Sequence, residues 1–165
     1  MTENIRAVSI GEIVISKDSD DILVSYGLGS CVAICLYDPI TKVGGMLHAL
    51  LPSSPKENGR NTLPSKFVDQ GIPLLVKSIE SLGVSSKSMI VKLCGGAHML
   101  SSPGFNDVLN IGKRNVAVAT ETLQRQGFQI SAQDTGGTSG RTVKLYINDG
   151  LVTVKTLGQG EIHLG

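Results

Sequence analysis

The sequence YGLGSCVAICLY, residues 26–37, joins a glycine-rich turn to an apolar run that opens at Cys31. An apolar, β-branched run bounded by glycine is typical of a strand, so we expect a strand over Cys31–Tyr37. Glycine permits a tight turn and the close approach of another segment or a ligand. The pattern therefore predicts a β-rich fold with a thiol at the start of one strand.

Other short apolar segments have similar boundaries, and we expect strands over Glu12–Ile15, Ile22–Ser25, Gly45–Leu51, Met89–Leu93, Gln129–Ala132, Thr142–Asn148 and Leu151–Thr156. The last two flank Asn148-Asp149-Gly150, which predicts a hairpin. Helical spacing appears from Val68 to Leu82 and from Val116 to Leu123. Pro73 lies inside the first helix, which should kink or begin there. We predict an α+β fold of packed β-sheets, a sandwich flanked by two or three α-helices.

The bulk composition fits one domain over residues 1–165, with 41% hydrophobic residues and a net charge of +1. Basic residues form no cluster of the kind that nucleic acid attracts, so nucleic acid is not an expected partner. No window reaches the ~20 apolar residues of a spanning helix, and no secretory segment opens the chain. We expect a cytoplasmic protein without membrane insertion. The polar segment from Pro52 to Pro64 should be an exposed mobile loop.

Three cysteines make a disulfide framework improbable and leave at least one free thiol. Cys31 follows the glycine-rich turn and is a candidate nucleophile, although a cysteine among apolar residues is more often inert core. Cys35 shares its face of the strand but lies about 13 Å further along, so we interpret it as core. Cys94 and His98 have ligand-like spacing, yet it is too loose to predict a zinc site, and no metal is expected.

A histidine, His48, appears seventeen residues after Cys31 in a second apolar strand that could pair beside the first. No helix N-terminus is predicted at the cysteine, so a neighbouring imidazole is the natural means of forming a thiolate near neutral pH. Cysteine and histidine together supply a nucleophile and a base. A buried structural histidine is the competing interpretation, and His98 is a rival base.

The sequence resembles the CheD family of bacterial chemoreceptor glutamine deamidases. The resemblance rests on Gly27–Val32, Met46–His48, Leu51-Pro52, Gly95–Ala97, Ile111–Asn115 and Asp134–Gly137, and it covers nearly the whole chain from about Ile10. It implies that Cys31 is the nucleophile and His48 its base, in packed β-sheets with outer helices. It also implies a third member six residues before the cysteine. That position is commonly threonine in the family, and here it is Ser25.

Residues around these positions are candidates for substrate binding, namely Gly29, Ser30, Gly95, Gly96, Asp134 and Thr135. Backbone N–H groups near Ser30 and Cys31 could stabilise an oxyanion. The segment from Asp134 to Gly137, with Arg141, is either a plain turn or a substrate-side loop. Lys113, Arg114 and Asn115 are expected on the solvated surface at a helix start.

The resemblance implies conversion of glutamine to glutamate on chemoreceptor cytoplasmic domains through a thioester, without a cofactor. Glutamate methyl ester hydrolysis is a related possibility that the sequence does not separate from deamidation. The family is also associated with the CheC phosphatase, so a second hypothesis is a regulatory adaptor that binds CheC and receptors with little turnover. A third is a redox-sensing thiol, for which Cys35 is badly placed as a resolving cysteine.

Overall fold

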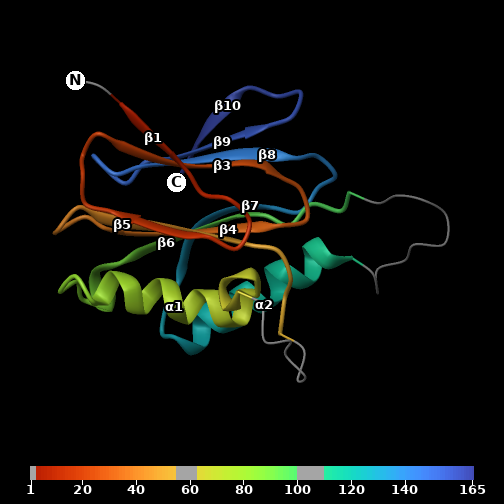
Figure 1. The fold of residues 1–165 in the computed structure, drawn as a ribbon. Helices are drawn as coiled ribbons and strands as arrows, with labels where there is room; N and C mark the ends of the chain where they lie inside the picture. The colour runs from red at the N-terminus through yellow and green to blue at the C-terminus, as the bar shows by residue number, and fades with distance from the viewer. Residues whose placement is uncertain (1–2, 55–62, 100–109) are drawn as a thin grey trace.

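The computed structural model describes residues 3–54, 63–99 and 110–165. Figure 1 shows three layers: two β-sheets packed face to face, and two helices on the outer face of one of them. The first sheet has the order β1 (Asn4–Ala7), β3 (Asp21–Leu28), β8 (Arg141–Tyr146), β9 (Val152–Thr156) and β10 (Glu161–Leu164). The second has the order β2 (Ile13–Ser16), β5 (Val43–Ala49), β4 (Val32–Asp38), β6 (Ile90–Gly95) and β7 (Ile130–Thr135). The predicted α+β sandwich is confirmed.

The apolar run after Cys31 forms the middle strand of the second sheet, and every residue of β4 is buried. Val32, Ile34 and Leu36 pack in the core beneath the helices, whereas Ala33 and Cys35 pack between the two sheets. A strand buried on both faces needs a continuous apolar sequence instead of alternation. This explains why residues 32–37 contain no charged side chain.

The helical layer consists of α1 (Val68–Glu80) and α2 (Ile111–Arg125), with short 3-10 turns at Pro64–Lys66 and Ser86–Ser88. Helix α1 begins at Val68 and runs through Pro73, so the expected start at the proline is not observed. Proline removes one i→i−4 hydrogen bond there. The apolar face of α1, which includes Ile72, Leu75 and Ile79, is fully buried and holds the helix on the sheet.

Most strand pairs are antiparallel, but β1–β3 and β6–β7 are parallel. The hairpin predicted at Asn148-Asp149-Gly150 is confirmed by the antiparallel pairing of β8 with β9. Two strands, β1 and β10, were not predicted. Both are sheet edges with mostly exposed residues, so they lack the apolar pattern of a buried strand. Much of the predicted loop after Pro52, residues 55–62, lies outside the described residues.

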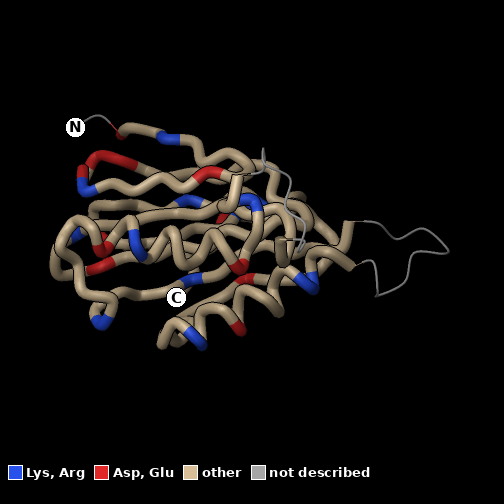
Figure 2. The backbone as a smooth tube through the Cα atoms, turned by 60° about the horizontal axis from the view of Figure 1, so that its bottom comes forward, with Lys and Arg blue, Asp and Glu red and all other residues tan. Residues whose placement is uncertain are grey.

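Charged residues of both signs are interspersed along the backbone in Figure 2. Within residues 3–54, 63–99 and 110–165, neither helix is long and apolar enough to cross a membrane.

Candidate active site

The turn that carries Cys31 lies where the chain passes from β3 in one sheet to β4 in the other. The pairing of β3 with β8 shifts register between Ser25 and Leu28. Gly27, in the intervening bulge, has a φ of 62°, which glycine adopts without strain. Ser25 and Leu28 are consequently both buried, while Tyr26 and Gly27 are exposed. Two residues separate the end of β3 from Cys31, which is 7% exposed.

Backbone hydrogen bonds from the end of β6 hold this turn. The Gly96 N–H donates to the Cys31 carbonyl at 2.8 Å, and the Ala97 N–H donates to the Gly29 carbonyl at 2.9 Å. Gly95 has a φ of 107°, and a Cβ atom there would lie 2.3 Å from the Cys31 oxygen. Both the backbone conformation and the close approach therefore require glycine at position 95.

His48 lies on β5 and is directly opposite Ala33 of β4 in the pairing register. Cys31 precedes Ala33 by two residues, so its side chain shares the inter-sheet face and lies diagonal to His48. Diagonal neighbours have Cα atoms roughly 7–8 Å apart, which is within reach of a long side chain. Cys35 is also diagonal to His48, on the other side of Ala33. The pairing register by itself therefore does not show whether Cys31 or Cys35 is the partner of His48.

The His48 ring is 3% exposed and has one oriented hydrogen bond. Its Nδ1 lies 2.9 Å from the carbonyl oxygen of Val8. Because a carbonyl only accepts, Nδ1 carries the proton, and the neutral ring keeps its lone pair on Nε2. The buried Nε2 has no hydrogen-bond partner among the described residues. The ring is thus a base whose accepting nitrogen is free.

Burial favours the neutral forms of the Cys31 thiol and the His48 imidazole. It raises the pKa of the Cys31 thiol, an effect opposed only by the residue's own backbone N–H. It also lowers the pKa of His48, against the opposing effects of the Val8 carbonyl and Glu12. Both shifts favour a neutral thiol beside a neutral imidazole in the free protein. No hydrogen bond joins the Cys31 sulfur to the ring in this state.

Ser25 is fully buried on β3, facing the second sheet. Its hydroxyl is 3.3 Å from the Val8 carbonyl and 3.1 Å from the sulfur of Met46. It forms no hydrogen bond with His48. Ser25 and His48 are therefore connected through one shared backbone carbonyl.

Asp134 and Thr135 form the end of β7 instead of a turn, which corrects the plain-turn alternative for these two residues. Arg141 donates from Nε to an Asp134 carboxylate oxygen at 3.1 Å and pairs with it again through a second nitrogen at 3.0 Å. This pair links β7 of one sheet to β8 of the other. Asp134 is thus occupied by a structural partner. Cys94 is buried nearby, and burial with the Asp134 charge raises its pKa to about 12.

One cavity adjoins the Cys31 turn and a second lies beside Gly96, and neither is lined by Cys31 or His48 themselves. One of about 80 Å³ is lined by Ser30, His98 and Asn110, and one of about 300 Å³ is lined by Gly96, Thr135 and Gly137, with His98 and Asn110 again in its wall. His98 is half-buried, and its backbone N–H donates to the Gly137 carbonyl at 2.8 Å. Four of the six proposed substrate-binding residues therefore line a cavity or hold the turn. Gly29 belongs to the turn itself, and Asp134 pairs with Arg141.

The expectation of a solvated Asn115 is wrong, because this residue is fully buried on α2. Its Nδ2 donates to the carbonyl oxygens of Ser30 and Leu50. The buried positions of α2 include Asn115, Ala119 and Thr122, a helical spacing that could have revealed it. The orienting Val8 carbonyl was also missed, because a backbone group leaves no signal in the sequence.

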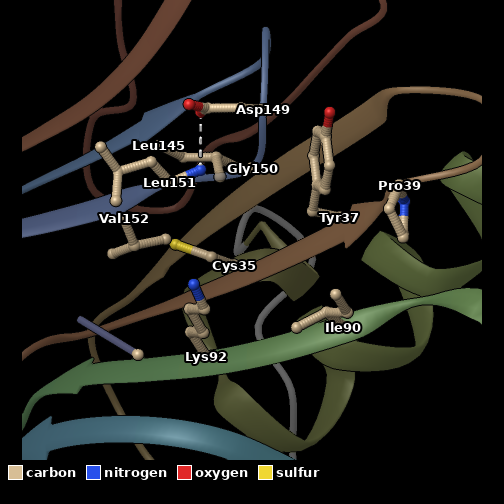
Figure 3. A pocket seen from close by; sticks show the side chains of 11 residues that line it. Cys35, Tyr37, Pro39, Ile90, Lys92, Leu145, Asp149, Gly150, Leu151 and Val152 are labelled. Atoms are coloured by element: carbon tan, nitrogen blue, oxygen red, sulfur yellow. Dashed lines mark hydrogen bonds between the residues drawn. The ribbon is translucent and has the colours of Figure 1, made fainter. Parts of the chain in front are cut away.

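The other end of the inter-sheet space holds a separate cavity of about 270 Å³. Figure 3 shows Cys35 and Lys92 from the second sheet pointing toward Leu145 and Val152 of the first. No histidine lines this cavity. Across the described part of the chain, no group of three or more His, Cys, Asp or Glu side chains could hold a metal ion.

The fold and site define an α+β sandwich protein with a buried cysteine and histidine on the inter-sheet face. The sequence model of CheD, described as CheD chemotactic sensory transduction, matches residues 50–156. A probable chemoreceptor glutamine deamidase CheD from Symbiobacterium thermophilum is 42% identical over 160 residues, covering 97% of each chain. Proteins of the same name from Thermococcus kodakarensis and Caldanaerobacter subterraneus are 44% and 45% identical, covering 94% and 97% of this chain and 94% and 98% of their own. The chain belongs to the CheD family.

Proposed function

We propose that this protein deamidates glutamine side chains on the cytoplasmic domains of chemoreceptors, with Cys31 as nucleophile and His48 as general base. The observation that carries the proposal is the His48 ring. Its Nδ1 is committed to the Val8 carbonyl, and its buried Nε2 is free on the face that Cys31 shares. The names of the relatives, probable chemoreceptor glutamine deamidase, support the same substrate.

In the first half-reaction, the Cys31 S–H proton passes to His48 Nε2 as the sulfur attacks the carboxamide carbon of glutamine. The carbonyl π bond opens to an oxyanion. When the oxyanion collapses, the C–N bond breaks, and the imidazolium proton goes to the departing nitrogen to give ammonia. A thioester between Cys31 and the side chain remains, and His48 is neutral again.

In the second half-reaction, His48 Nε2 takes a proton from water as the water oxygen attacks the thioester carbon. Collapse of this intermediate breaks the C–S bond, and the imidazolium returns its proton to the sulfur. The products are glutamate and the Cys31 thiol. Hydrolysis of a glutamate methyl ester follows the same steps with methanol as the leaving group.

The raised pKa of the Cys31 thiol and the lowered pKa of His48 fit proton transfer that accompanies attack, as opposed to a stored thiolate. Catalytic hydrogen bonds are often long in free enzymes and shorten once substrate is bound. The Ser30 and Cys31 N–H groups donate to no backbone carbonyl in the described part of the chain. They are the oxyanion donors we propose, each aimed from the turn that Gly95 and Gly96 hold.

The test is intact-mass spectrometry of a chemoreceptor cytoplasmic fragment from the same organism, which gains about one dalton for each glutamine converted. The fragment is incubated with wild type, Cys31→Ala or Cys35→Ala. Cys35 is the matched control because it lies two residues after Ala33, as Cys31 lies two residues before it, and both pack in the same inter-sheet core. We expect a mass gain with wild type and Cys35→Ala and none with Cys31→Ala.

No gain with folded wild type would overturn the deamidase proposal. The adaptor hypothesis would then take its place, and it expects binding of receptor and a CheC-type phosphatase to survive Cys31→Ala. A gain with Cys31→Ala, but not with Cys35→Ala, would keep the activity and reassign the nucleophile.

A further inference from the structure

One buried amide on α2 connects both halves of the candidate site. The Nδ2 of Asn115 donates to the Ser30 carbonyl at 2.9 Å and to the Leu50 carbonyl at 3.0 Å. Ser30 immediately precedes Cys31, and Leu50 follows His48 by two residues. Because both partners are carbonyl oxygens, which only accept, the orientation of the amide is fixed by chemistry. The two hydrogen bonds therefore tie the nucleophile's turn to the end of the strand that carries the base.

The helix that presents this amide is itself held against the turn after β6. A Cβ atom on Gly112 would lie 2.3 Å from the Ala97 carbonyl oxygen, and one on Gly96 would lie 2.4 Å from the Val116 side chain. Such close contacts leave little freedom for the first turns of α2. Asn115 thus projects from a rigid element, which is how proteins hold a site to the tolerance that chemistry needs.

The remaining atom of the amide is unpaired. Asn115 Oδ1 is buried and has no hydrogen-bond partner among the described residues. A buried acceptor without a partner costs roughly 1–3 kcal/mol. The hydrogen bonds that offset this cost are the two that its N–H groups donate at the site.

We propose that Asn115 is a positioning residue for deamidation, setting the separation between the Cys31 turn and the His48 strand. The inference rests on the proposed function, since it assumes that these two groups react together. Cys31 and His48 are diagonal neighbours without a hydrogen bond, so their alignment depends on what joins their segments. A displacement of about 1 Å in an active site can lower the rate on the order of 100-fold.

The test compares Asn115→Ala and Asn115→Asp with Thr122→Val in the full chain. Thr122 is a matched control, because it lies on the buried face of the same helix, and its hydroxyl is also buried and unpaired. Four quantities are measured: kcat and KM on the receptor fragment, the rate of Cys31 alkylation by iodoacetamide as a function of pH, and the free energy of unfolding. The alkylation profile reports how well His48 assists the thiol, which a purely structural role would not change.

We expect Asn115→Ala to lower kcat by roughly 100-fold with KM changed less than about threefold, and to move Cys31 alkylation to higher pH. Thr122→Val should leave both readouts near wild type. If Asn115→Ala folds and its kcat and alkylation profile match those of Thr122→Val, the proposal is overturned. If Asn115→Ala does not fold, the same two outcomes are judged on Asn115→Asp, which keeps the size but cannot donate to both carbonyls.

The two proposals fail separately. If wild type does not deamidate the receptor fragment, the alkylation profile alone decides: a shift with the Asn115 variants supports positioning, and an unchanged profile overturns it. If wild type deamidates and the Asn115 variants match Thr122→Val, the proposed function stands and the positioning role is rejected.

Discussion

Cys31 and Cys35 lie two residues on either side of Ala33, the residue paired with His48; Cys35 is within β4, and Cys31 immediately precedes it. Both thiols are buried, and burial raises the pKa of each. They differ in their surroundings. Cys31 is 7% exposed and follows a glycine-rich turn whose Ser30 lines one cavity, whereas Cys35 lies opposite Met46, is 2% exposed and lines a separate cavity without a histidine. Because the pairing register is alike for both thiols, any difference in their reactivity must come from exposure and from the local backbone.

The surroundings of Cys35 favour its neutral thiol. The Lys92 ammonium and the neighbouring Cys94 act on the Cys35 pKa in opposite directions, and burial dominates both. The surrounding side chains, including Tyr37 and Leu145, are largely apolar. A neutral thiol is therefore stable at this end, and no histidine lines the cavity beside it.

The largest effect we expect comes from removing the base. His48→Gln should lower deamidation by roughly 10²–10⁴-fold, since general base assistance by a positioned imidazole supplies about that much. The control is His98→Gln, at the rival histidine beside the same cavities, which should keep more than about a third of the activity. Rates on the receptor fragment measure both variants. A large loss with His98→Gln and none with His48→Gln would move the base to His98.

Selective alkylation sharpens the contrast between the thiols. At pH 7.5 iodoacetamide should modify Cys31 roughly 100-fold faster than Cys35, because burial raises the pKa of Cys35 well above its ordinary value and its alkylation requires local opening. Peptide mapping after timed quenching gives both rates in one sample, with unfolded protein as the control for intrinsic reactivity. Equal rates in the folded protein would show that the two environments do not differ chemically.

The next prediction concerns Gly95, which lies against the Cys31 carbonyl oxygen. Gly95→Ala places a methyl group 2.3 Å from the Cys31 oxygen at a φ of 107°, so both overpacking and backbone strain apply. We expect a stability loss of roughly 2–4 kcal/mol and activity at least tenfold lower. Gly83→Ala is the control, since its φ is 84° and nothing lies within 4 Å. It should lose about 1 kcal/mol in urea unfolding and keep its activity.

Much of the fold was predictable from local patterns, and much of the site was not. The strand over residues 32–37 is evident because burial on both faces requires a continuous apolar run. The hairpin at Asn148-Asp149-Gly150 is evident because a tight turn requires such residues. The strands β1 and β10 are edges held by backbone pairing, which apolar periodicity does not report. Sequence chemistry selected Cys31 and His48. It could not select the Val8 carbonyl, which acts through backbone, or Asn115, whose burial depends on tertiary packing.

The pH dependence of folding stability should report the burial of His48. Burial lowers the His48 pKa, so below about pH 6.5 the unfolded chain binds a proton that the folded chain resists. Folding stability from this group is complete above that pH and falls as the pH decreases through the lowered value. Between pH 7 and pH 5, wild type should therefore lose more stability in urea than His48→Gln. If the free energy of unfolding changes with pH in the same way for wild type and His48→Gln, the folded state does not resist protonation of His48, and the prediction is wrong.

The smallest expected effect concerns Ser25, whose position the family commonly fills with threonine. In this structure the Val8 carbonyl orients His48, and Ser25 reaches the ring only through that carbonyl. Ser25→Ala should therefore lower kcat by less than about tenfold, and Ser25→Thr should stay close to wild type. Steady-state rates on the receptor fragment measure both variants. A loss with Ser25→Ala as large as that of His48→Gln would mean that the hydroxyl meets the imidazole during the reaction, and that the backbone carbonyl orients the ring only while the site is empty.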